Sequence, residues 1–200
     1  MVYYSVMANR KAVGIVGTGR AGSGLLERSA YCELKSYQTA DIVNDATEDF
    51  CSRYISPTSV AYSRMVDAAR QGKYGIIDGS EAAAVSKTVE LKLTGAARCH
   101  LEGLLVDCEE FLKEHELPLW EKNSPDALKI RVLAYEPDRS YACYRSHIRR
   151  SPESGANTLI CLVNQATYLL RRQMDSLERL MFQQCGGSVG PYSARRRRGL

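Results

Sequence analysis

Residues 65–112 carry the sequence feature that most restricts the possible folds, because two consecutive stretches repeat apolar or small residues every three or four positions. This spacing is that of one face of an α-helix, and no β-strand has it. The repeating residues are Met65, Ala69, Gly72 and Ile76 in the first stretch and Leu91, Thr94, Ala97, Leu101, Leu104, Cys108 and Leu112 in the second. The sequence therefore predicts a helical hairpin, turning at Gly79 and Ser80, that needs further helices to cover its apolar face.

The same helical spacing extends over most of the chain. We expect helices at residues 34–55 and 59–78, a third from Ser86 to His115 and a last one from Ser151 to about Gln184. Short connections between long amphipathic helices favour antiparallel neighbours. The sequence thus predicts an all-α fold, an antiparallel up-down four-helix bundle that spans residues 34–187.

An extra helical segment, broken once, is predicted at residues 124–150. Ser124 and Pro125 form a start signal, because serine caps the first amides and proline has the backbone angle of a first helical turn. Pro137 then interrupts the segment, since it lacks an amide hydrogen. Before it, the apolar residues 117–120 (Leu-Pro-Leu-Trp) are expected to fold back onto the end of the bundle.

The helical patterns also predict which side chains are buried. The buried stripe of the first helix is Ile42, Val43, Ala46, Phe50 and Tyr54, with Asp45, Glu48, Asp49 and Arg53 on its outer side. The stripe of the last helix is Leu159, Leu162, Val163, Ala166, Leu169, Leu170, Gln173, Leu177 and Leu180. Of all these positions, Leu101 and Leu170 are the ones we expect at the centre of the core.

The two ends of the chain differ from the bundle region. Residues 1–33 contain Gly17-x-Gly19-x-x-Gly22, which on paper matches the glycine fingerprint of dinucleotide-binding proteins. No second strand follows, so a βαβ unit cannot form, and we expect a flexible N-terminal extension. A nucleotide-dependent enzyme that uses the loop from Gly17 to Gly24 is the alternative. Residues 188–200 are polar and basic and are predicted to be a disordered tail.

Charge and hydropathy limit the class of protein further. The chain has 27 Lys and Arg residues against 23 Asp and Glu, and Arg195 to Arg198 supply the four extra positive charges, so the body is neutral. A neutral body lacks the composition of a domain built on a broad basic surface. No apolar run approaches the ~20 residues that span a bilayer, and no signal peptide is recognisable. We therefore expect a cytoplasmic protein with no membrane partner.

Cysteine and histidine show no spacing typical of metal or catalytic sites. The seven cysteines include no C-x-x-C pair, and we interpret them as buried thiols in a reducing compartment. The histidines at 100, 115 and 147 lack ligand spacing. The acidic residues Glu109, Glu110, Glu114 and Glu116 crowd the end of the third long helix and are interpreted as a solvated face. No cofactor, no metal and no enzymatic activity are predicted.

Several stretches resemble a known bacterial family. They are LKSYQTADIVNDAT, MVDAARQGK, GSEAAAVSKTVELKLTGAAR, LPLW, DRSYACYRS and ANTLICLVNQATYLLRRQMDSLERLMFQQCGG. Their order and spacing are similar to those of the four-helix-bundle proteins encoded by intervening sequences of 23S rRNA genes. The LPLW and ANTLICLVNQATYLL stretches resemble the subgroup called four helix bundle suffix proteins.

The resemblance covers roughly residues 34–187 and carries several implications. It implies a left-handed four-helix bundle that associates with itself, in the best-known relatives as a ring of five, and it implies no enzymatic activity. One relative is the accessory protein of diversity-generating retroelements, which binds a reverse transcriptase and nucleic acid. Nucleic acid, or an enzyme that processes it, is therefore an expected partner.

Two basic regions are the candidate nucleic-acid-binding sites. The first is the tail, Arg195, Arg196, Arg197 and Arg198, which is either a phosphate-binding segment or a solubilising end. In the second, tyrosines 135, 141, 144 and 168 lie near arginines 139, 145, 149, 150, 171 and 172, of which Arg145, Arg149, Arg171 and Arg172 are the candidate binding residues. Aromatic rings interleaved with arginine stack on bases and hold phosphates, but they also occur at the edges of a bundle core. The predicted function is a non-enzymatic, oligomeric adaptor or scaffold, with a structural bundle that binds only a protein as the alternative.

Overall fold

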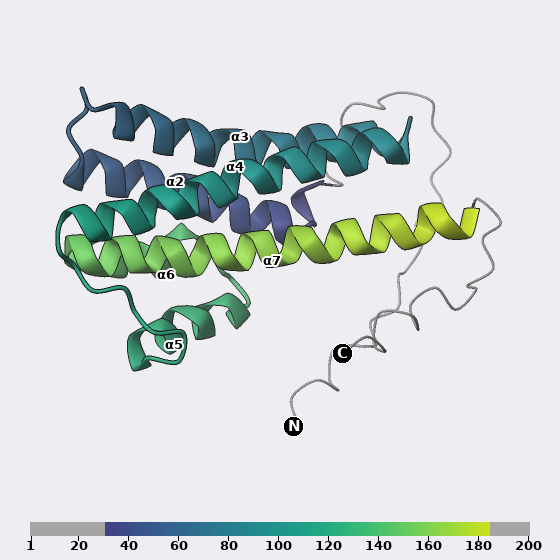
Figure 1. The fold of residues 1–200 in the computed structure, drawn as a ribbon. Helices are drawn as coiled ribbons and strands as arrows, with labels where there is room; N and C mark the ends of the chain where they lie inside the picture. The colour runs from purple at the N-terminus through teal and green to yellow at the C-terminus, as the bar shows by residue number, and fades with distance from the viewer. Residues whose placement is uncertain (1–30, 185–200) are drawn as a thin grey trace, which may run out of the picture.

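The computed structural model describes residues 31–184 (Figure 1). Within this range the chain is entirely helical. The helices are α2 (Lys35–Tyr54), α3 (Val60–Ala82), α4 (Lys87–Glu114), α5 (Pro125–Val132), α6 (Tyr141–Arg150) and α7 (Pro152–Gln184), with a 3₁₀ turn at Leu133–Tyr135 after α5. The all-α prediction is confirmed for these residues. The predicted N-terminal extension lies, except for its last residues, outside the described range, and so does the predicted tail.

The four long helices surround one apolar core. Helix α3 packs on α2 and α4, and α7 closes the arrangement by packing on both α4 and α2. Each of them runs opposite in direction to the two helices it contacts (Figure 1). The short helix α6 packs across α2 and α7, whereas α5 rests on α7. The predicted extra segment is thus an addition to one side of the four long helices.

Side-chain caps account for where α3, α4, α5 and α7 begin, whereas α2 and α6 have no such hydrogen bond. Ser59, Ser86 and Ser124 each accept a hydrogen bond from an amide of the first turn of α3, α4 and α5. Ser151 Oγ does the same for α7, accepting from the Ser154 amide at 3.0 Å. Such caps satisfy amides that have no partner inside the helix. The starts predicted at Ser86, Ser124 and Ser151 are confirmed.

Most of the predicted core positions are buried, whereas Tyr54, Leu91, Leu169 and Gln173 are half-buried. Leu101 and Leu170 are both 0 % exposed, as are Val43, Ala46 and Phe50 of α2. Leu180 is the one exposed residue of the stripe of α7, because 46 % of it remains exposed. This outer end of α7 lies beyond Gln173, which accepts a hydrogen bond from Ser36 in the first turn of α2. Beyond that level α2 no longer covers α7, so the stripe loses one of its two partners.

The turn predicted at Gly79 and Ser80 is wrong, since α3 continues through both residues to Ala82. Gly79 is buried against α4, and a Cβ atom at this position would lie 3.1 Å from Thr94 Oγ1. One turn and two turns earlier, Gly75 and Gly72 face Ala97 and Leu101 of α4 in the same way. These glycines therefore allow the two helices to approach closely, and the chain turns only after them.

The segment before α5 folds back as predicted. The Trp120 amide donates to Asn157 Oδ1 at 2.8 Å, and the indole Nε1 donates to Glu153 Oε1 at 3.0 Å. Asn157 Nδ2 in turn donates to the Pro118 carbonyl at 2.9 Å. Asn157 is 1 % exposed, so these bonds satisfy a buried amide and fix the segment on the first turns of α7.

Candidate functional site

The structure separates the proposed arginines into three groups. Arg145 and Arg149 lie on α6, and Arg171 and Arg172 lie on α7. The four arginines at 195–198 lie outside the described residues. The two helical pairs differ in what they contact, and this difference decides which of them is free to bind a ligand.

Arg149 is engaged by an acidic side chain of α2. Its Nε and Nη2 donate to the two carboxylate oxygens of Asp49 at 2.6 and 3.1 Å. The Tyr141 hydroxyl donates to the same carboxylate, and Arg53 Nε lies 3.3 Å from it. The prediction that Asp49 lies on the outer side of α2 is corrected, because only 14 % of its side chain is exposed. Helix α6 covers it, and the pattern of α2 alone gives no sign of that.

These contacts shift the pKa values of Asp49 and Tyr141. The hydrogen bond from Arg149 lowers the pKa of Asp49 to about 2, with further bonds from Tyr141 and Arg53 acting against the effect of burial. Burial and the adjacent carboxylate raise the pKa of Tyr141 to about 12. Asp49 is therefore a carboxylate and Tyr141 a neutral donor over the whole physiological range. The cluster fastens α6 to α2.

Lowering the pH should break the ion pair between Asp49 and Arg149. A carboxyl group whose pKa is depressed in the folded state stabilises the fold above its unfolded pKa, and the contribution is lost as the pH falls through the folded pKa. The window for Asp49 runs from about 4 down to about 2. We expect Asp49→Asn to lower stability at pH 7 and to flatten the loss of stability in this window, measured by urea unfolding at several pH values. If the stability of the variant falls as steeply with decreasing pH as that of the unchanged protein, other carboxyl groups cause the fall.

Arg145 is also in contact with its own helix. Its guanidinium carbon lies 5.4 Å from the centre of the Tyr141 ring, within the range of a cation–π interaction. Arg145 and Arg149 of α6 thus both contact intramolecular partners, whereas Arg150 of the same helix has no ion pair within the described residues. Tyr144, which directly precedes Arg145, is fully buried, so the interpretation as core holds for this tyrosine.

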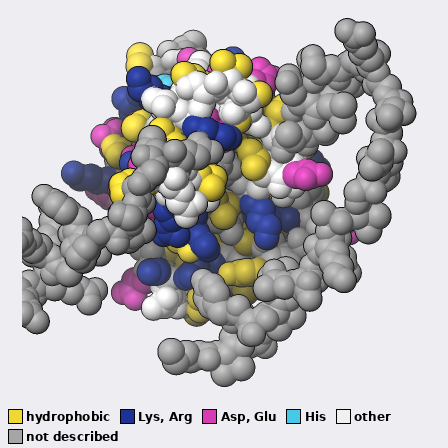
Figure 2. Space-filling view, turned by 90° about the vertical axis from the view of Figure 1, so that its right-hand side faces the viewer, with side chains coloured by type: hydrophobic (Ala, Val, Ile, Leu, Met, Phe, Trp, Pro, Cys, Tyr) yellow, Lys and Arg dark blue, Asp and Glu magenta, His cyan; other side chains and the backbone are white. Residues whose placement is uncertain are grey.

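The outer face of α7 is different. Arg171 and Arg172 are exposed, and among residues 31–184 neither has a carboxylate within ion-pair distance. Tyr168 lies one turn before them and is 53 % exposed. Figure 2 shows the end of the molecule at which α7 finishes, where Lys and Arg side chains lie among apolar ones. The outer face of α7 can thus offer the guanidinium groups of Arg171 and Arg172 and the ring of Tyr168 to one ligand.

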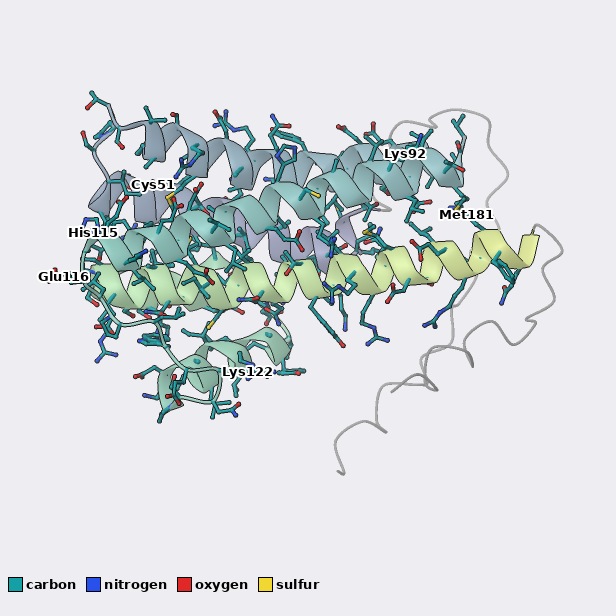
Figure 3. All side chains as sticks on the ribbon, viewed as in Figure 1. Cys51, Lys92, His115, Glu116, Lys122 and Met181 are labelled. Atoms are coloured by element: carbon teal, nitrogen blue, oxygen red, sulfur yellow. The ribbon has the colours of Figure 1, made fainter. Side chains whose placement is uncertain are left out.

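A pocket lies at the other end of the long helices, where α2 and α4 finish and α3 begins. Its volume is about 220 Å³, and its walls include Tyr54, Phe111 and His115. Figure 3 shows His115 at this end and Lys92 and Met181 at the other. The only cation in the wall that forms ion pairs is Arg64, 2.8 Å from Asp107 and 3.2 Å from Glu110.

The one arginine in the wall of this pocket is taken up by two of its three acidic residues, Asp107 and Glu110. Asp107 is 8 % exposed, and burial raises its pKa although Arg64 opposes the shift. The pattern of α4 did not predict a buried acid here, because the partner arginine comes from α3. His115 Nδ1 lies 2.8 Å from the Phe111 carbonyl, which fixes the ring against the Phe111 ring. The wall offers no serine or cysteine bonded to a histidine, the arrangement that nucleophilic catalysis requires.

The cysteines follow the prediction in part. Cys51 and Cys108 are buried, and burial raises the pKa of the Cys51 thiol to about 12 and that of Cys108 as well. A thiol that stays protonated is a poor nucleophile. Cys32 and Cys99 are exposed, however, so the expectation of uniformly buried thiols is wrong for these two.

Neither a search for metal sites and membrane-spanning helices nor comparison with known proteins assigns a function. In the described part of the chain, no group of three or more His, Cys, Asp or Glu side chains is arranged to hold a metal ion. None of the helices there is both long and apolar enough to cross a bilayer. Comparison of the sequence and structure with protein-family models, curated proteins and solved structures finds no match.

Proposed function

We propose that this protein is a non-enzymatic adaptor that binds nucleic acid through the outer face of α7, defined here by Tyr168, Arg171, Arg172 and Arg179. The observation that carries the proposal is that Arg171 and Arg172 are exposed without a carboxylate partner in the described residues, next to an exposed tyrosine. Arginine binds phosphate oxygens and tyrosine stacks on an unpaired base, which suits single-stranded nucleic acid. Arg149 is left out, because Asp49 holds its guanidinium.

The basic tail belongs to the same proposal. The chain continues from the end of α7 at Gln184 towards Arg195, so the tail starts from the half of α7 that carries the proposed face. Two basic regions attached to one helix would reinforce each other, because binding of the first raises the local concentration of the second. The tail would add affinity without sequence preference, since phosphate contacts carry no base information.

The proposal includes the arrangement of the helices and the assembly of the protein. We propose that α2, α3, α4 and α7 form an antiparallel up-down four-helix bundle, which their pairwise packing supports. We further propose membership of the 23S rRNA intervening-sequence protein family and assembly into a ring, in the form of five copies that the sequence resemblance implies. A ring would present several copies of the α7 face and of the tail together, which favours a scaffold over an enzyme.

The test is the salt dependence of binding to a short, labelled single-stranded RNA. We expect Arg171→Gln with Arg172→Gln to weaken binding and to reduce the slope of log affinity against log salt by about 1.4, since each lost phosphate contact with a single strand removes about 0.7. Fluorescence anisotropy over a salt series measures both quantities. The matched control is Arg70→Gln with Lys113→Gln, which removes two exposed cations that lie on α3 and α4.

Deletion of residues 193–200 separates the two basic regions. Equal loss of slope in the control and in the α7 variant would mean that only overall charge matters. An unchanged α7 variant together with a deletion that abolishes binding would move the site to the tail. If the intact protein binds neither RNA nor DNA at low salt, the nucleic-acid part of the proposal is rejected.

A further inference from the structure

A shallow apolar groove lies between α5 and α6. Its lining consists of Pro125, Leu128, Lys129, Val132, Leu133 and His147. Leu128 is 44 % and Val132 60 % exposed, although both are apolar residues of a helix that packs on α7. Exposed apolar side chains that are grouped in a depression mark a surface that another molecule covers. We call this surface the α5–α6 groove.

The rim of the α5–α6 groove is basic. Lys129 lines it and pairs only with Asp126, at 2.9 Å on the surface. Arg150 is exposed and has no ion pair within the described residues. The pKa of His147, in the wall of the groove, is lowered by burial and then by Arg150 and Lys129, with Asp126 acting in the opposite direction, so the two cations outweigh the one acid at this wall. An acidic partner surface with an apolar centre would fit it.

Helix α4 carries a surface of that kind. Val106 is 51 % exposed, and Glu109 and Glu110 follow it on the exposed side of the helix. Gly103 lies one turn before Val106, and a Cβ atom there would have nothing within 4 Å. We call these four residues the acidic α4 face. Glu110 is also paired with Arg64 of α3 at 3.2 Å, whereas Glu109 has no ion pair among residues 31–184. Glu109 lies near the C-terminal end of α4, where the helix dipole disfavours negative charge.

Gly103 is the informative member of the acidic α4 face. Glycine in a helix interior costs ~1 kcal/mol relative to alanine. At Gly72 and Gly155 a side chain would collide with neighbours inside the molecule, which explains the glycine. Nothing inside one copy explains Gly103, because the space around it is open. Close approach of a second surface would explain both the missing side chain and the exposed valine.

We infer that the acidic α4 face of one copy docks into the α5–α6 groove of the next copy. The inference rests on the oligomeric part of the proposed function, and it assigns the two surfaces that make the contact. Their charges are opposite, and each has an apolar centre. In Figure 1, α4 and α5 lie on opposite sides of α7, so the two surfaces of one copy cannot meet each other. A contact between two different surfaces is head-to-tail and closes into a ring when its rotation allows.

Charge reversal on each surface provides the test. The first variant is Lys129→Glu with Arg150→Glu, the second is Glu109→Lys with Glu110→Lys, and the third combines all four changes. Like charges facing each other cost several kcal/mol, so each of the first two variants should weaken assembly by at least about 100-fold. The third variant should recover most of it, because the charges are again opposite. Sedimentation velocity over a concentration series measures the assembly, and circular dichroism verifies that each variant is folded.

The control reverses Asp78 and Glu81, two exposed acids on α3 away from both surfaces, and should assemble like the unchanged protein. Assembly that survives both single-surface variants would overturn the inference while leaving the oligomeric proposal intact. A third variant that stays dissociated would also overturn it. If the unchanged protein is a monomer throughout, the inference and the oligomeric proposal fail together, whereas nucleic-acid binding is tested separately by the α7 variant.

Discussion

Truncation of Leu101 or Leu170 to alanine is expected to lower the free energy of unfolding by about 2–5 kcal/mol. Both side chains are 0 % exposed and lie at the centre of the core formed by α2, α3, α4 and α7. The change removes buried methyl groups and leaves a cavity that the neighbouring helices cannot fill. This is a large fraction of the ~5–15 kcal/mol that stabilises an ordinary domain.

Leu101 is expected to lie in the upper part of that range. The residue opposite it on α3 is Gly72, where even a Cβ atom would lie 2.5 Å from Leu101 Cδ2. Gly72 has no side chain that could move into the space vacated by Leu101. The cavity therefore persists, and the cost of a core truncation rises with the volume that remains empty.

Urea unfolding followed by circular dichroism, at one fixed protein concentration, measures both variants. The concentration must be fixed because self-association stabilises the folded state by mass action. Leu180→Ala is the matched control, since Leu180 lies on α7 with 46 % of its surface exposed. Its effect should stay within about 0.5 kcal/mol. Losses below ~1 kcal/mol for both core variants would mean that the buried faces are misassigned.

The parts of the fold that the sequence predicts correctly depend on local signals. Ser86, Ser124 and Ser151 cap helices through their own first-turn amides, so a short window contains all the necessary information. The burial of Leu101 and Leu170 follows from a helical period that repeats over many turns. Arg171 and Arg172 occupy the side of α7 opposite to its apolar stripe, although the sequence alone left open whether they belong to a binding site or to the edge of the core.

The parts that the sequence does not reveal depend on contacts between distant segments. Gly79 was expected to end a helix, yet it is a packing residue whose partner, Thr94, lies on the next helix. Asp49 was assigned to the outer side of α2, yet Arg149 and Tyr141 of α6 cover it. A charged residue on a helix has the same local pattern whether it meets water or a partner about 100 positions away. Only the packing of α6 on α2 distinguishes the two cases.

Gly155→Ala is the second substitution with a large expected effect. It should lower the stability of the protein, whereas a change from glycine to alanine in a helix usually raises it. In a helix interior alanine is normally better than glycine by ~1 kcal/mol. At position 155 the new Cβ atom would lie 2.7 Å from the Ile148 carbonyl oxygen and 2.8 Å from Phe50 Cδ2. The first of these atoms belongs to the backbone of α6, and the second to a ring that is 0 % exposed.

Neither neighbour of Gly155 can move cheaply. Displacing the Ile148 carbonyl shifts α6, which the ion pair between Arg149 and Asp49 fastens to α2. Displacing Phe50 disturbs its edge contact with Phe111, whose ring centre lies 5.0 Å away. Overpacking of this kind costs about 1–3 kcal/mol, which outweighs the gain in helix propensity. We therefore expect a net loss of stability from a substitution that removes no contact.

Gly103→Ala supplies the matched comparison for Gly155→Ala. Its Cβ atom would meet nothing within 4 Å in one copy, so at concentrations where the protein is monomeric it should gain up to ~1 kcal/mol. The two variants, measured side by side by urea unfolding, should thus change stability in opposite directions. A gain at position 155 would mean that α6 does not pack as closely on α7 as the Ile148 carbonyl indicates. If Gly103→Ala also weakens self-association at higher concentration, the added methyl group blocks the close approach that the open space around Gly103 permits.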